Sequence, residues 1–320
     1  MRKLYGANVL VPTKGMSEDV WVQHRRAGIG GSDLGGILGV SPYSSPLSVW
    51  LAKVEGHQKP VSRAAHRGKM CEDWIRREAA ERNGWKVKQV HAILQHPLHT
   101  WMLANVDGVV TNLGPKHEIL EIKFINSSQV SSKLVDRNEP LDEHLLQVAW
   151  YMAVTDLDRA HIVYDLPNHD PLDFVVDRDL EFEEHLITSA RRFWEMVEGN
   201  TPPALDGSLD ASEYLKVKFA DANGETVQLP DTCAQYVNEY QAASVGIKEL
   251  ETVKERAKQM LEAALGNNTI GYAGGAAVSW KPVTTNRLDT EALKRDHPRI
   301  VSEYTRPTES RRFSIKGGIA

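Results

Sequence analysis

The chain of 320 residues contains only two cysteines, Cys71 and Cys233, which lie far apart and outside any paired-cysteine motif. Two such cysteines exclude a disulfide scaffold and any cysteine-rich zinc or iron–sulfur site. No apolar run approaches the roughly 18 residues that a membrane-spanning helix requires, and the N-terminus lacks the apolar stretch of a secretory signal. We therefore expect a cytoplasmic protein that makes no contact with a membrane.

The sequence also lacks an excess of positive charge, because its 43 acidic residues outnumber its 38 lysines and arginines. The formal net charge of −5 argues against a protein that coats nucleic acid with its whole surface. It is compatible with DNA binding in a local cleft, because affinity depends on where the charges lie. Basic side chains gather early in the chain, as in a cleft or a solvated face: Arg25, Arg26, Lys53, Lys59, Arg63, His66, Arg67 and Lys69.

Apolar residues recur first at helical spacing and later with the alternation of strands. The pattern predicts helices over residues 46–54, 68–83, 143–154 and 181–198, and strands over residues 85–90, 100–104, 118–124, 160–166 and 172–176. Gly84 is expected to end the second helix, Trp74 to lie in the core, and the first 20 residues to form an irregular lead-in. Strands framed by helices predict an α/β or α+β layered domain.

A stretch rich in Pro, Gly, Asp and Ser predicts a linker over residues 201–231, between a first domain (1–200) and an extension (232–320). The extension opens with a long helical pattern over residues 232–265 and ends with a small β-containing tail. Apolar residues near heptad spacing suggest that this helix pairs with another helix, in this chain or in a neighbouring subunit. They are Val237, Tyr240, Ile247, Leu250, Ala257 and Leu261.

The clearest chemical signal is an acidic residue followed by a Glu-x-Lys string on a neighbouring predicted strand. Residues two apart in a strand share a face, so Glu121 and Lys123 project to the same side. A hairpin through residues 111–116 would set Asp107 across from Glu121. Alone, Asp107-Gly108 is typical of a turn and Glu-x-Lys of a solvated edge. Together they predict two carboxylates and one ammonium within a few ångströms.

Two carboxylates at close range are costly unless a cation compensates for their charge. Magnesium suits this group because it prefers hard oxygen ligands and keeps several waters. The ion would polarise a phosphodiester oxygen and activate water, and Lys123 would orient that water or stabilise the charge that develops on the phosphate. The residues therefore predict metal-assisted phosphodiester hydrolysis, with magnesium as cofactor and manganese as a substitute.

These strings resemble the signature of the PD-(D/E)xK nuclease superfamily, and more narrowly the YqaJ-type viral recombinase family, which includes the exonuclease of bacteriophage lambda. The resemblance covers about residues 21–199 and implies a restriction-endonuclease-like core, a mixed sheet flanked by helices. The first motif runs from Arg25 through Ser32 to Asp33. By resemblance, Arg25 and Ser32 grip the 5′ phosphate of duplex DNA, although Arg26 could replace Arg25, and Ser32 or Asp33 could simply cap a helix.

Two further motifs complete the resemblance. Gly68-Lys69-Met70-Cys71-Glu72 matches a helical glutamate that joins the metal shell in the family, although Glu72 would also suit a helix N-terminus. Gln147 and Tyr151 match a Q-x-x-x-Y pattern and lie on one helix face. By resemblance, Asp107, Glu121 and the backbone carbonyl of Ile122 hold the metal, with Glu72 supporting a second site.

The resemblance implies a 5′-to-3′ exonuclease that degrades linear double-stranded DNA in phage-type recombination, in the cytoplasm of a bacterial host and of phage or prophage origin. It also implies a homo-oligomer, expected as a trimeric ring, and a single-strand annealing protein as a possible partner. One alternative is an endonuclease or resolvase on the same core. Another is a catalytically silent DNA-binding or assembly protein, against which the complete set of Asp107, Glu121 and Lys123 argues.

Overall fold

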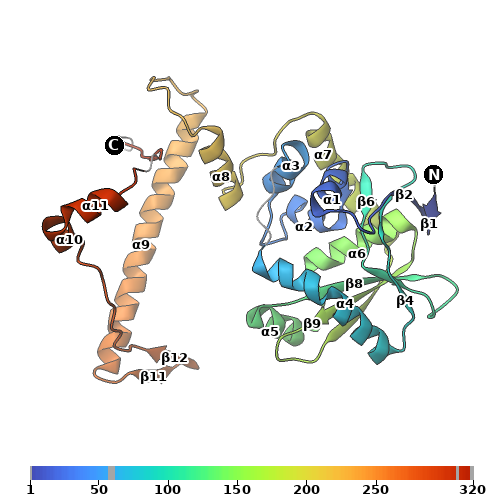
Figure 1. The fold of residues 1–320 in the computed structure, drawn as a ribbon. Coiled ribbons are helices and arrows are strands. Elements are labelled where there is room, and N and C mark those ends of the chain that lie inside the picture. The colour runs from blue at the N-terminus through green and yellow to red at the C-terminus, as the bar shows by residue number, and fades with distance from the viewer. Residues whose placement is uncertain (1, 57–61, 308–309, 318–320) are drawn as a thin grey trace. The chain divides into compact units, whose positions relative to one another are not determined.

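The computed structural model describes residues 2–56, 62–307 and 310–317, so Lys59 of the predicted basic group lies outside the described residues. The chain divides into two compact units, Met1–Leu215 and Lys216–Ala320 (Figure 1). The first unit is built from two mixed five-stranded sheets and the helices that pack on them, which confirms the predicted α/β layered class. The division lies inside the stretch predicted as a linker, where the helix α8 (Leu209–Lys218) forms.

The elements of the first unit alternate between short strands and helices. They are β1 (Lys3–Leu4), β2 (Ala7–Pro12), α1 (Glu18–Arg25), β3 (Ile29–Gly30), the 3-10 turn η1 (Gly31–Asp33), α2 (Leu34–Ile37), α3 (Pro46–Val54), α4 (Arg63–Asn83), β4 (Val87–Lys88), β5 (Ala92–Gln95), β6 (Met102–Ala104), β7 (Gly108–Val110), β8 (Glu118–Phe124), α5 (Ser128–Arg137), α6 (Asp142–Thr155), β9 (Arg159–Asp165), β10 (Leu172–Asp177) and α7 (Leu180–Glu198).

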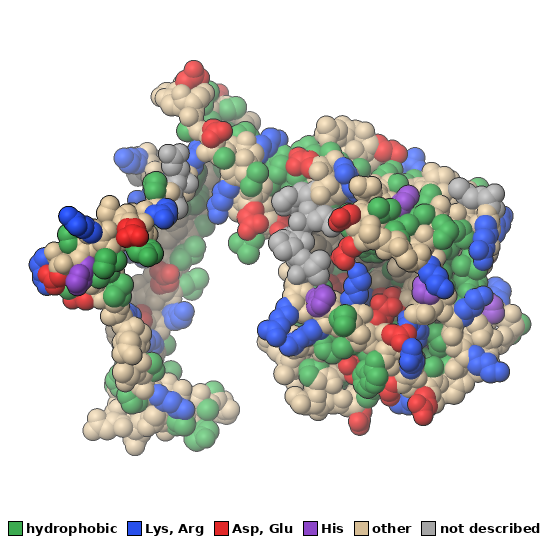
Figure 2. All heavy atoms as spheres, in the orientation of Figure 1, with side chains coloured by type: hydrophobic (Ala, Val, Ile, Leu, Met, Phe, Trp, Pro, Cys, Tyr) green, Lys and Arg blue, Asp and Glu red, His purple; other side chains and the backbone are tan. Residues whose placement is uncertain are grey.

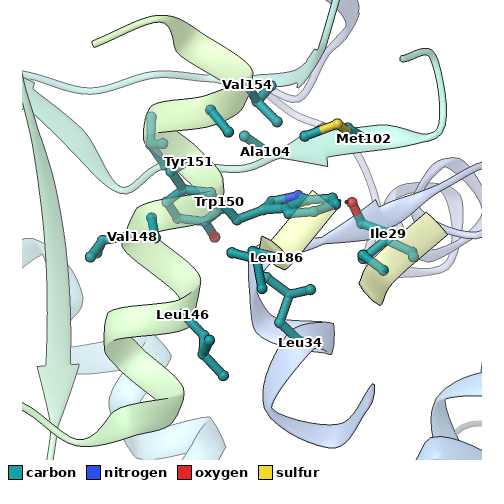
Figure 3. Close-up of a cluster of buried hydrophobic side chains, with 14 of the residues drawn as sticks. Ile29, Leu34, Met102, Ala104, Leu146, Val148, Trp150, Tyr151, Val154 and Leu186 are labelled. Carbon is teal, nitrogen blue, oxygen red and sulfur yellow. Dashed lines mark hydrogen bonds between the residues drawn. The ribbon is translucent and has the colours of Figure 1, made fainter. Parts of the chain in front are cut away.

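The first sheet has the strand order β1-β2-β5-β6-β3, in which only the β3–β6 pair is parallel. The indole of Trp150, on α6, fixes this pair, because its Nε1 donates to the carbonyl oxygens of Ile29 (3.2 Å) and Leu103 (3.0 Å). Trp150 is fully buried among apolar side chains that include Ile29 and Leu34 (Figure 3). The core helix therefore sets the position of the turn η1, which follows β3.

The second sheet has the order β10-β9-β8-β7-β4, with β8 and β9 parallel and the other neighbours antiparallel. The central strand β8 alternates as predicted. Leu120 and Ile122 pack with Ile75 and Ala79 of α4 on one face, so Glu121 is directed to the opposite face, where α6 lies. The central strand thus presents its charged residues toward a buried helix, which is where the site forms.

Several local predictions were right and others were wrong. Helix α3 and strand β8 have the predicted bounds, and Gly84 ends α4 with a left-handed φ of 66°. The predicted lead-in is wrong, since it contains β1, β2 and the start of α1. Strands of two to four residues, such as β5 and β7, are too short to show a period. Trp74 is 60% exposed on α4 rather than in the core.

The second unit consists of the helix α9 (Cys233–Leu265), the hairpin β11 (Ile270–Ala273) and β12 (Ala276–Ser279), and the short helices α10 (Thr290–Asp296) and α11 (Pro298–Tyr304). The single helix α9 confirms the helical pattern predicted over residues 232–265. Among the described residues, none of the helices is both long enough and apolar enough to span a bilayer.

Candidate active site

The structure brings together the two carboxylates and the lysine that the sequence singled out. Gly108 pairs with Leu120 in the β7–β8 hairpin, so Asp107 lies beside Glu121 at the next position of the register. One carboxylate oxygen of Asp107, Oδ2, accepts from the backbone N–H of Ile122 at 2.9 Å. The Lys123 ammonium lies 2.7 Å from Oε1 of Glu121. The predicted hairpin is confirmed, although β7 rather than the strand at residues 102–104 supplies its first arm.

Helix α6 provides an amide that organises this group. Gln147 accepts from Lys123 Nζ through Oε1 (2.8 Å) and donates through Nε2 to Glu121 Oε1 (2.6 Å) and to the Tyr151 hydroxyl (3.0 Å). Gly31 of η1 packs directly on these side chains. A Cβ there would meet the Tyr151 ring at 2.7 Å and the Gln147 carbonyl at 2.9 Å. The Q-x-x-x-Y pattern therefore fixes the conformations of Glu121 and Lys123.

Burial and like charge make the two carboxylates reluctant to ionise. Burial, followed by the charges of Glu121 and Glu72, holds the pKa of Asp107 well above its ordinary value, while Lys123 and the N–H of Ile122 act against this rise. Burial also raises the pKa of Glu121, although Lys123 opposes the shift. The pKa of Tyr151 is raised by burial and then by the nearby Glu121 and Asp107 charges, so its hydroxyl stays protonated. The single ammonium of Lys123 therefore does not offset the cost of burying two carboxylates together.

The carboxylate pair fits a small hard cation. Within the described residues, Oε2 of Glu121 is buried without a hydrogen-bond partner, although such oxygens are nearly always satisfied. No group of three or more His, Cys, Asp or Glu side chains in those residues is arranged to hold a metal by itself. Magnesium does not need one, since it is often held by one or two carboxylates and several waters. Asp107, Glu121 and the carbonyl of Ile122 are suitable ligands.

Glu72 approaches the pair from α4, as the predicted second motif requires. Its carboxylate is 39% exposed and lies 3.3 Å from Nη1 of the buried Arg76. Its charge raises the pKa of both Asp107 and Glu121, so all three acids share one electrostatic environment. Glu72 is therefore placed to add an oxygen at the open side of the pair.

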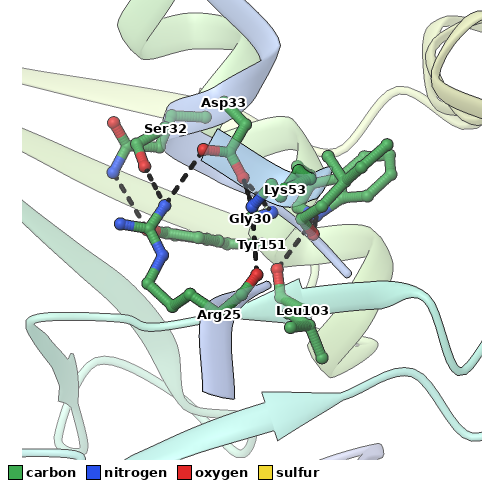
Figure 4. Close-up of polar contacts among 10 residues, drawn as sticks. Arg25, Gly30, Ser32, Asp33, Lys53, Leu103 and Tyr151 are labelled. Atoms are coloured by element: carbon green, nitrogen blue, oxygen red, sulfur yellow. Dashed lines mark hydrogen bonds and ion pairs between the residues drawn. The ribbon is translucent and has the colours of Figure 1, made fainter. Parts of the chain in front are cut away.

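A second polar group surrounds the turn η1, which follows β3. The Arg25 guanidinium donates from Nη2 to Ser32 Oγ (2.7 Å) and Asp33 Oδ1 (3.2 Å) (Figure 4). It also stacks on the Trp21 ring, with 4.8 Å between Cζ and the ring centroid. The side chain of Arg25 stays 25% exposed. A fixed, partly exposed guanidinium beside a hydroxyl can bind phosphate oxygens through two donors.

Asp33 and Lys53 form the buried support of this group. Lys53 Nζ, on a side chain only 4% exposed, contacts Asp33 Oδ2 at 2.6 Å and the Arg25 carbonyl oxygen at 3.0 Å. Although burial would raise the pKa of Asp33, the Lys53 and Arg25 charges hold it below its ordinary value. Asp33 also accepts from the N–H of Gly30 at 2.8 Å. These contacts of Asp33 hold Arg25 in place beside Ser32.

Arg26 is directed elsewhere. Its Nε and Nη2 donate to the carbonyl oxygens of Lys53 (3.0 Å) and Val54 (2.6 Å) at the end of α3. The guanidinium therefore satisfies carbonyls that a helix C-terminus leaves without partners. Of the two adjacent arginines that the sequence could not distinguish, the structure places Arg25 with Ser32 and Arg26 outside the group.

One cavity of about 630 Å³ connects the two groups. The face of the unit drawn in Figure 2 is hollowed, with acidic and basic side chains at the opening. The cavity lining includes predicted residues of both groups: Arg25, Ser32, Glu72, Asp107, Gln147 and Tyr151. A ligand bound to Arg25 and a ligand bound near the carboxylates therefore share one space.

Sequence reasoning did not assign a role to Lys53, Trp21 or Asn105. Lys53 lies in an otherwise apolar stretch of α3 beside the buried Trp50 and Leu51. A lysine in such a stretch signals a buried acidic partner. Trp21 and Asn105 both line the cavity, and the indole N–H of Trp21 donates to Asn105 Oδ1 at 3.3 Å. Neither residue belongs to a sequence pattern that would predict its place in the cavity.

The Lys53–Asp33 pair gives a testable prediction about stability. Replacing Lys53 with Met removes one partner of a buried ion pair, which is expected to lower the free energy of unfolding by about 3–5 kcal/mol. Denaturant unfolding would measure the change. The matched control is Lys69→Met, because Lys69 pairs with Glu18 at the surface (67% and 53% exposed) and should matter by less than about 1 kcal/mol. Equal effects of the two variants would contradict the assigned burial.

The structure is similar to that of an alkaline exonuclease (LHK-Exo) from Laribacter hongkongensis, with 21% identity, a TM-score of 0.48, and coverage of 63% of this chain and 98% of that one. A phage-related exonuclease from Haemophilus somnus is similar at 12% identity and a TM-score of 0.39, over 54% of this chain and 96% of the other.

The sequence relationships are stronger. Residues 20–158 match the YqaJ-like viral recombinase domain. The chain is 33% identical to the protein YqaJ of Bacillus subtilis (strain 168) over 318 residues, which cover 97% of this chain and 98% of that protein. The chain therefore belongs to the YqaJ-like viral recombinase family, as its four motifs predicted.

Proposed function

We propose that the protein is a metal-dependent exonuclease that degrades linear double-stranded DNA from the 5′ end, in phage-type recombination in the cytoplasm of a bacterial host. The observation that carries the proposal is a cavity whose lining includes Arg25 and Ser32 as well as Asp107. Gln147 also lines this cavity and holds Glu121 and Lys123 beside Asp107. One group suits a terminal phosphate and the other suits hydrolysis of a phosphodiester. An enzyme that starts at an end needs both in one space.

The residues of this chain would divide the work. Arg25 and Ser32 bind the terminal phosphate, and Lys53 and Asp33 hold Arg25 in place. Asp107, Glu121 and the Ile122 carbonyl would hold magnesium, or manganese in its place, with Glu72 at a second position. The ion would supply a Lewis acid and a more acidic water. Lys123, fixed by Gln147 and Glu121, donates hydrogen bonds to the attacking water or the phosphate oxygens.

The most informative experiment compares substrates of different topology. Purified protein is incubated with linear duplex and with closed and nicked circular duplex, with and without magnesium, using label at the 5′ or the 3′ end. We expect magnesium-dependent loss of the linear duplex alone, with 5′ label released first. Internal cutting of closed circles would assign the site to an endonuclease. DNA binding without cleavage of any substrate would assign it to a silent binding protein.

The role of Arg25 gives a separate prediction. Arg25→Ala should reduce the preference for 5′-phosphorylated over 5′-hydroxyl ends by about 10- to 100-fold, because a charge-assisted hydrogen bond is worth about 1.5–3 kcal/mol. Cleavage rates on the two ends give this ratio. Arg26→Ala is the control, since its guanidinium contacts only carbonyl oxygens in the hydrogen bonds described above. A ratio that stays constant in Arg25→Ala, or falls equally in both variants, would remove Arg25 from phosphate binding.

The family resemblance also supports proposals about organisation. We propose a nuclease domain over residues 1–200, a linker over residues 201–231 and a C-terminal extension over residues 232–320. We further propose that the nuclease domains assemble as a closed ring of three around DNA, and that a single-strand annealing protein receives the strand that remains. The number of chains in the assembly, which a ring of three requires to be a multiple of three, and co-purification with such a protein test the last two statements.

A further inference from the structure

Helix α9 of the second unit carries an apolar stripe that the described part of the chain leaves largely uncovered. Of the 33 residues of α9, only Leu265 is buried. Large apolar side chains along the helix are well exposed, among them Tyr236 (60%), Ile247 (57%) and Leu250 (70%). Figure 1 draws α9 as one continuous helix. A straight helix of 33 residues spans about 50 Å. Such a stripe on so long a helix is the mark of a missing partner.

The stripe follows the seven-residue repeat of a coiled coil from one end of α9 to the other. Counting from Cys233, the a positions are Cys233, Tyr240, Ile247, Lys254 and Leu261, and the d positions are Tyr236, Ala243, Leu250, Ala257 and Ala264. Among these positions Lys254 alone is charged. A polar residue at a single a position specifies the register and the oligomer state of a coiled coil.

We propose that α9 pairs with α9 of a second copy of this chain, and that the two helices run antiparallel. In one antiparallel register every a position faces a d position, and each alanine faces a longer side chain. The pairs are Cys233 with Ala264, Tyr236 with Leu261, Tyr240 with Ala257, Ala243 with Lys254, and Ile247 with Leu250. Every layer is filled, as close packing requires.

The parallel arrangement fails on charge and on volume. It would place Lys254 directly against Lys254 of the second copy, where two like charges repel each other in a desolvated seam. It would also set Ala243, Ala257 and Ala264 each against itself and leave three underfilled layers. The antiparallel register avoids both costs, because Lys254 lies over Ala243, whose short side chain lets the ammonium reach solvent.

Gly246 provides an independent observation. A glycine inside a helix costs about 1 kcal/mol relative to alanine, yet a Cβ at Gly246 would meet no atom within 4 Å in this chain. No contact within the described part of this chain therefore explains why a glycine occupies this position. In the antiparallel register Gly246 lies against Val253 of the second copy, a side chain that is 65% exposed in one copy. The missing side chain leaves room for that valine.

The surroundings of the stripe are compatible with this pairing. Phe313 contacts the edge of Tyr240, with ring centroids 5.4 Å apart. The second copy adds only the small Ala257 at this layer, so the Phe313 ring can stay. On the flanks, Glu251 lies near Ser244 and Lys258 near Val237 of the other helix, so like charges do not meet there.

Cross-linking between single-cysteine proteins tests the orientation. In the full-length chain, Cys71 and Cys233 are replaced with serine, and cysteine is introduced as Ala243→Cys in one protein and Lys254→Cys in another. After mixing and mild oxidation, we expect a covalent dimer only in the mixture, because residue 243 faces residue 254. A dimer formed by each protein alone would establish the parallel arrangement. The absence of any covalent dimer would overturn the pairing.

The mass of the assembly tests the pairing without cysteines. The double variant Ile247→Glu with Leu250→Glu places four acids in the central layers, and we expect light scattering to report half the mass of the unaltered protein. Val245→Glu is the matched control, because Val245 is 56% exposed but lies on the opposite face of α9. An unchanged mass of the double variant would overturn the proposal. Neither the cross-linking pattern nor the mass depends on nuclease activity. A failure of the α9 pairing is therefore distinguishable from a failure of the proposed function.

Discussion

Replacing Lys123 with methionine is expected to lower the rate of DNA cleavage by about 10³-fold or more. The ammonium contacts Glu121 at 2.7 Å and the Gln147 amide at 2.8 Å, at the edge of the carboxylate pair. Preorganised donors at such positions stabilise charge that develops in the transition state, and loss of one costs about 10²–10³-fold. Loss of a proton-transfer partner adds to this effect. Methionine replaces the aliphatic part of the side chain with one of similar length and lacks only the terminal ammonium.

The control for this experiment is a lysine that lines the cavity without contacting the carboxylate pair. This is Lys69, whose ammonium pairs with Glu18 at 3.0 Å. Lys69→Met should therefore change the single-turnover rate less than tenfold, while both variants still bind duplex DNA and unfold cooperatively. If Lys123→Met retained more than a tenth of the rate, or if Lys69→Met were equally impaired, Lys123 would have no special part in the chemistry.

The chemical centre was predictable because its signal lies on one regular element. Strand β8 is seven residues long, so its alternation assigns Leu120 and Ile122 to one face and Glu121 and Lys123 to the other. Asp107 was assigned to the correct hairpin but to the wrong strand, because β7 has only three residues and Asp107-Gly108 has the sequence of a turn. The short stretch of chain between residues 107 and 121 was therefore enough to predict that Asp107 and Glu121 lie close together, although β7 itself was not predicted.

The phosphate group was less predictable, because tertiary contacts decide it. Arg25 and Arg26 are adjacent and chemically identical, and only the position of α3 directs one guanidinium to Ser32 and the other to the carbonyls of Lys53 and Val54. Lys53 was placed in a basic group that could line a cleft or a solvated face, whereas it is buried against Asp33. A buried ion pair needs two partners, and nothing in the sequence says which residues 20 apart will meet.

The buried carboxylate pair is expected to lower the free energy of unfolding of the metal-free protein at neutral pH. Asp107 is buried beside Glu121, and burial together with the Glu121 and Glu72 charges raises its pKa well above the ordinary value of about 3.9. An acid with a raised pKa binds its proton more tightly in the folded state than in the unfolded state. The stability of the metal-free protein is therefore expected to fall as the pH rises from about 4 through the raised pKa.

Replacing Asp107 with asparagine should separate stability from activity. Asparagine keeps an oxygen that can accept from the Ile122 N–H and removes the charge. We expect the metal-free variant to gain about 1–3 kcal/mol in free energy of unfolding at neutral pH, to lose much of the pH dependence described above, and to lose cleavage by at least about 10³-fold. Denaturant unfolding between pH 4 and pH 8 measures the change in stability, and a cleavage assay measures the change in activity. Both are carried out with and without magnesium at millimolar concentration.

Magnesium should reverse the order of stability, which gives the experiment a second arm. A ligand that binds only the folded state stabilises it in proportion to the logarithm of its concentration above Kd. The unaltered protein should thus gain stability with added magnesium, and Asp107→Asn should gain far less. Asp136→Asn, which makes the same change at an exposed site on α5, should behave as the unaltered protein in every respect. A metal-free Asp107→Asn protein that is less stable than the unaltered one would show that the carboxylate contributes to folding, and that the pair is not held in place for a cation.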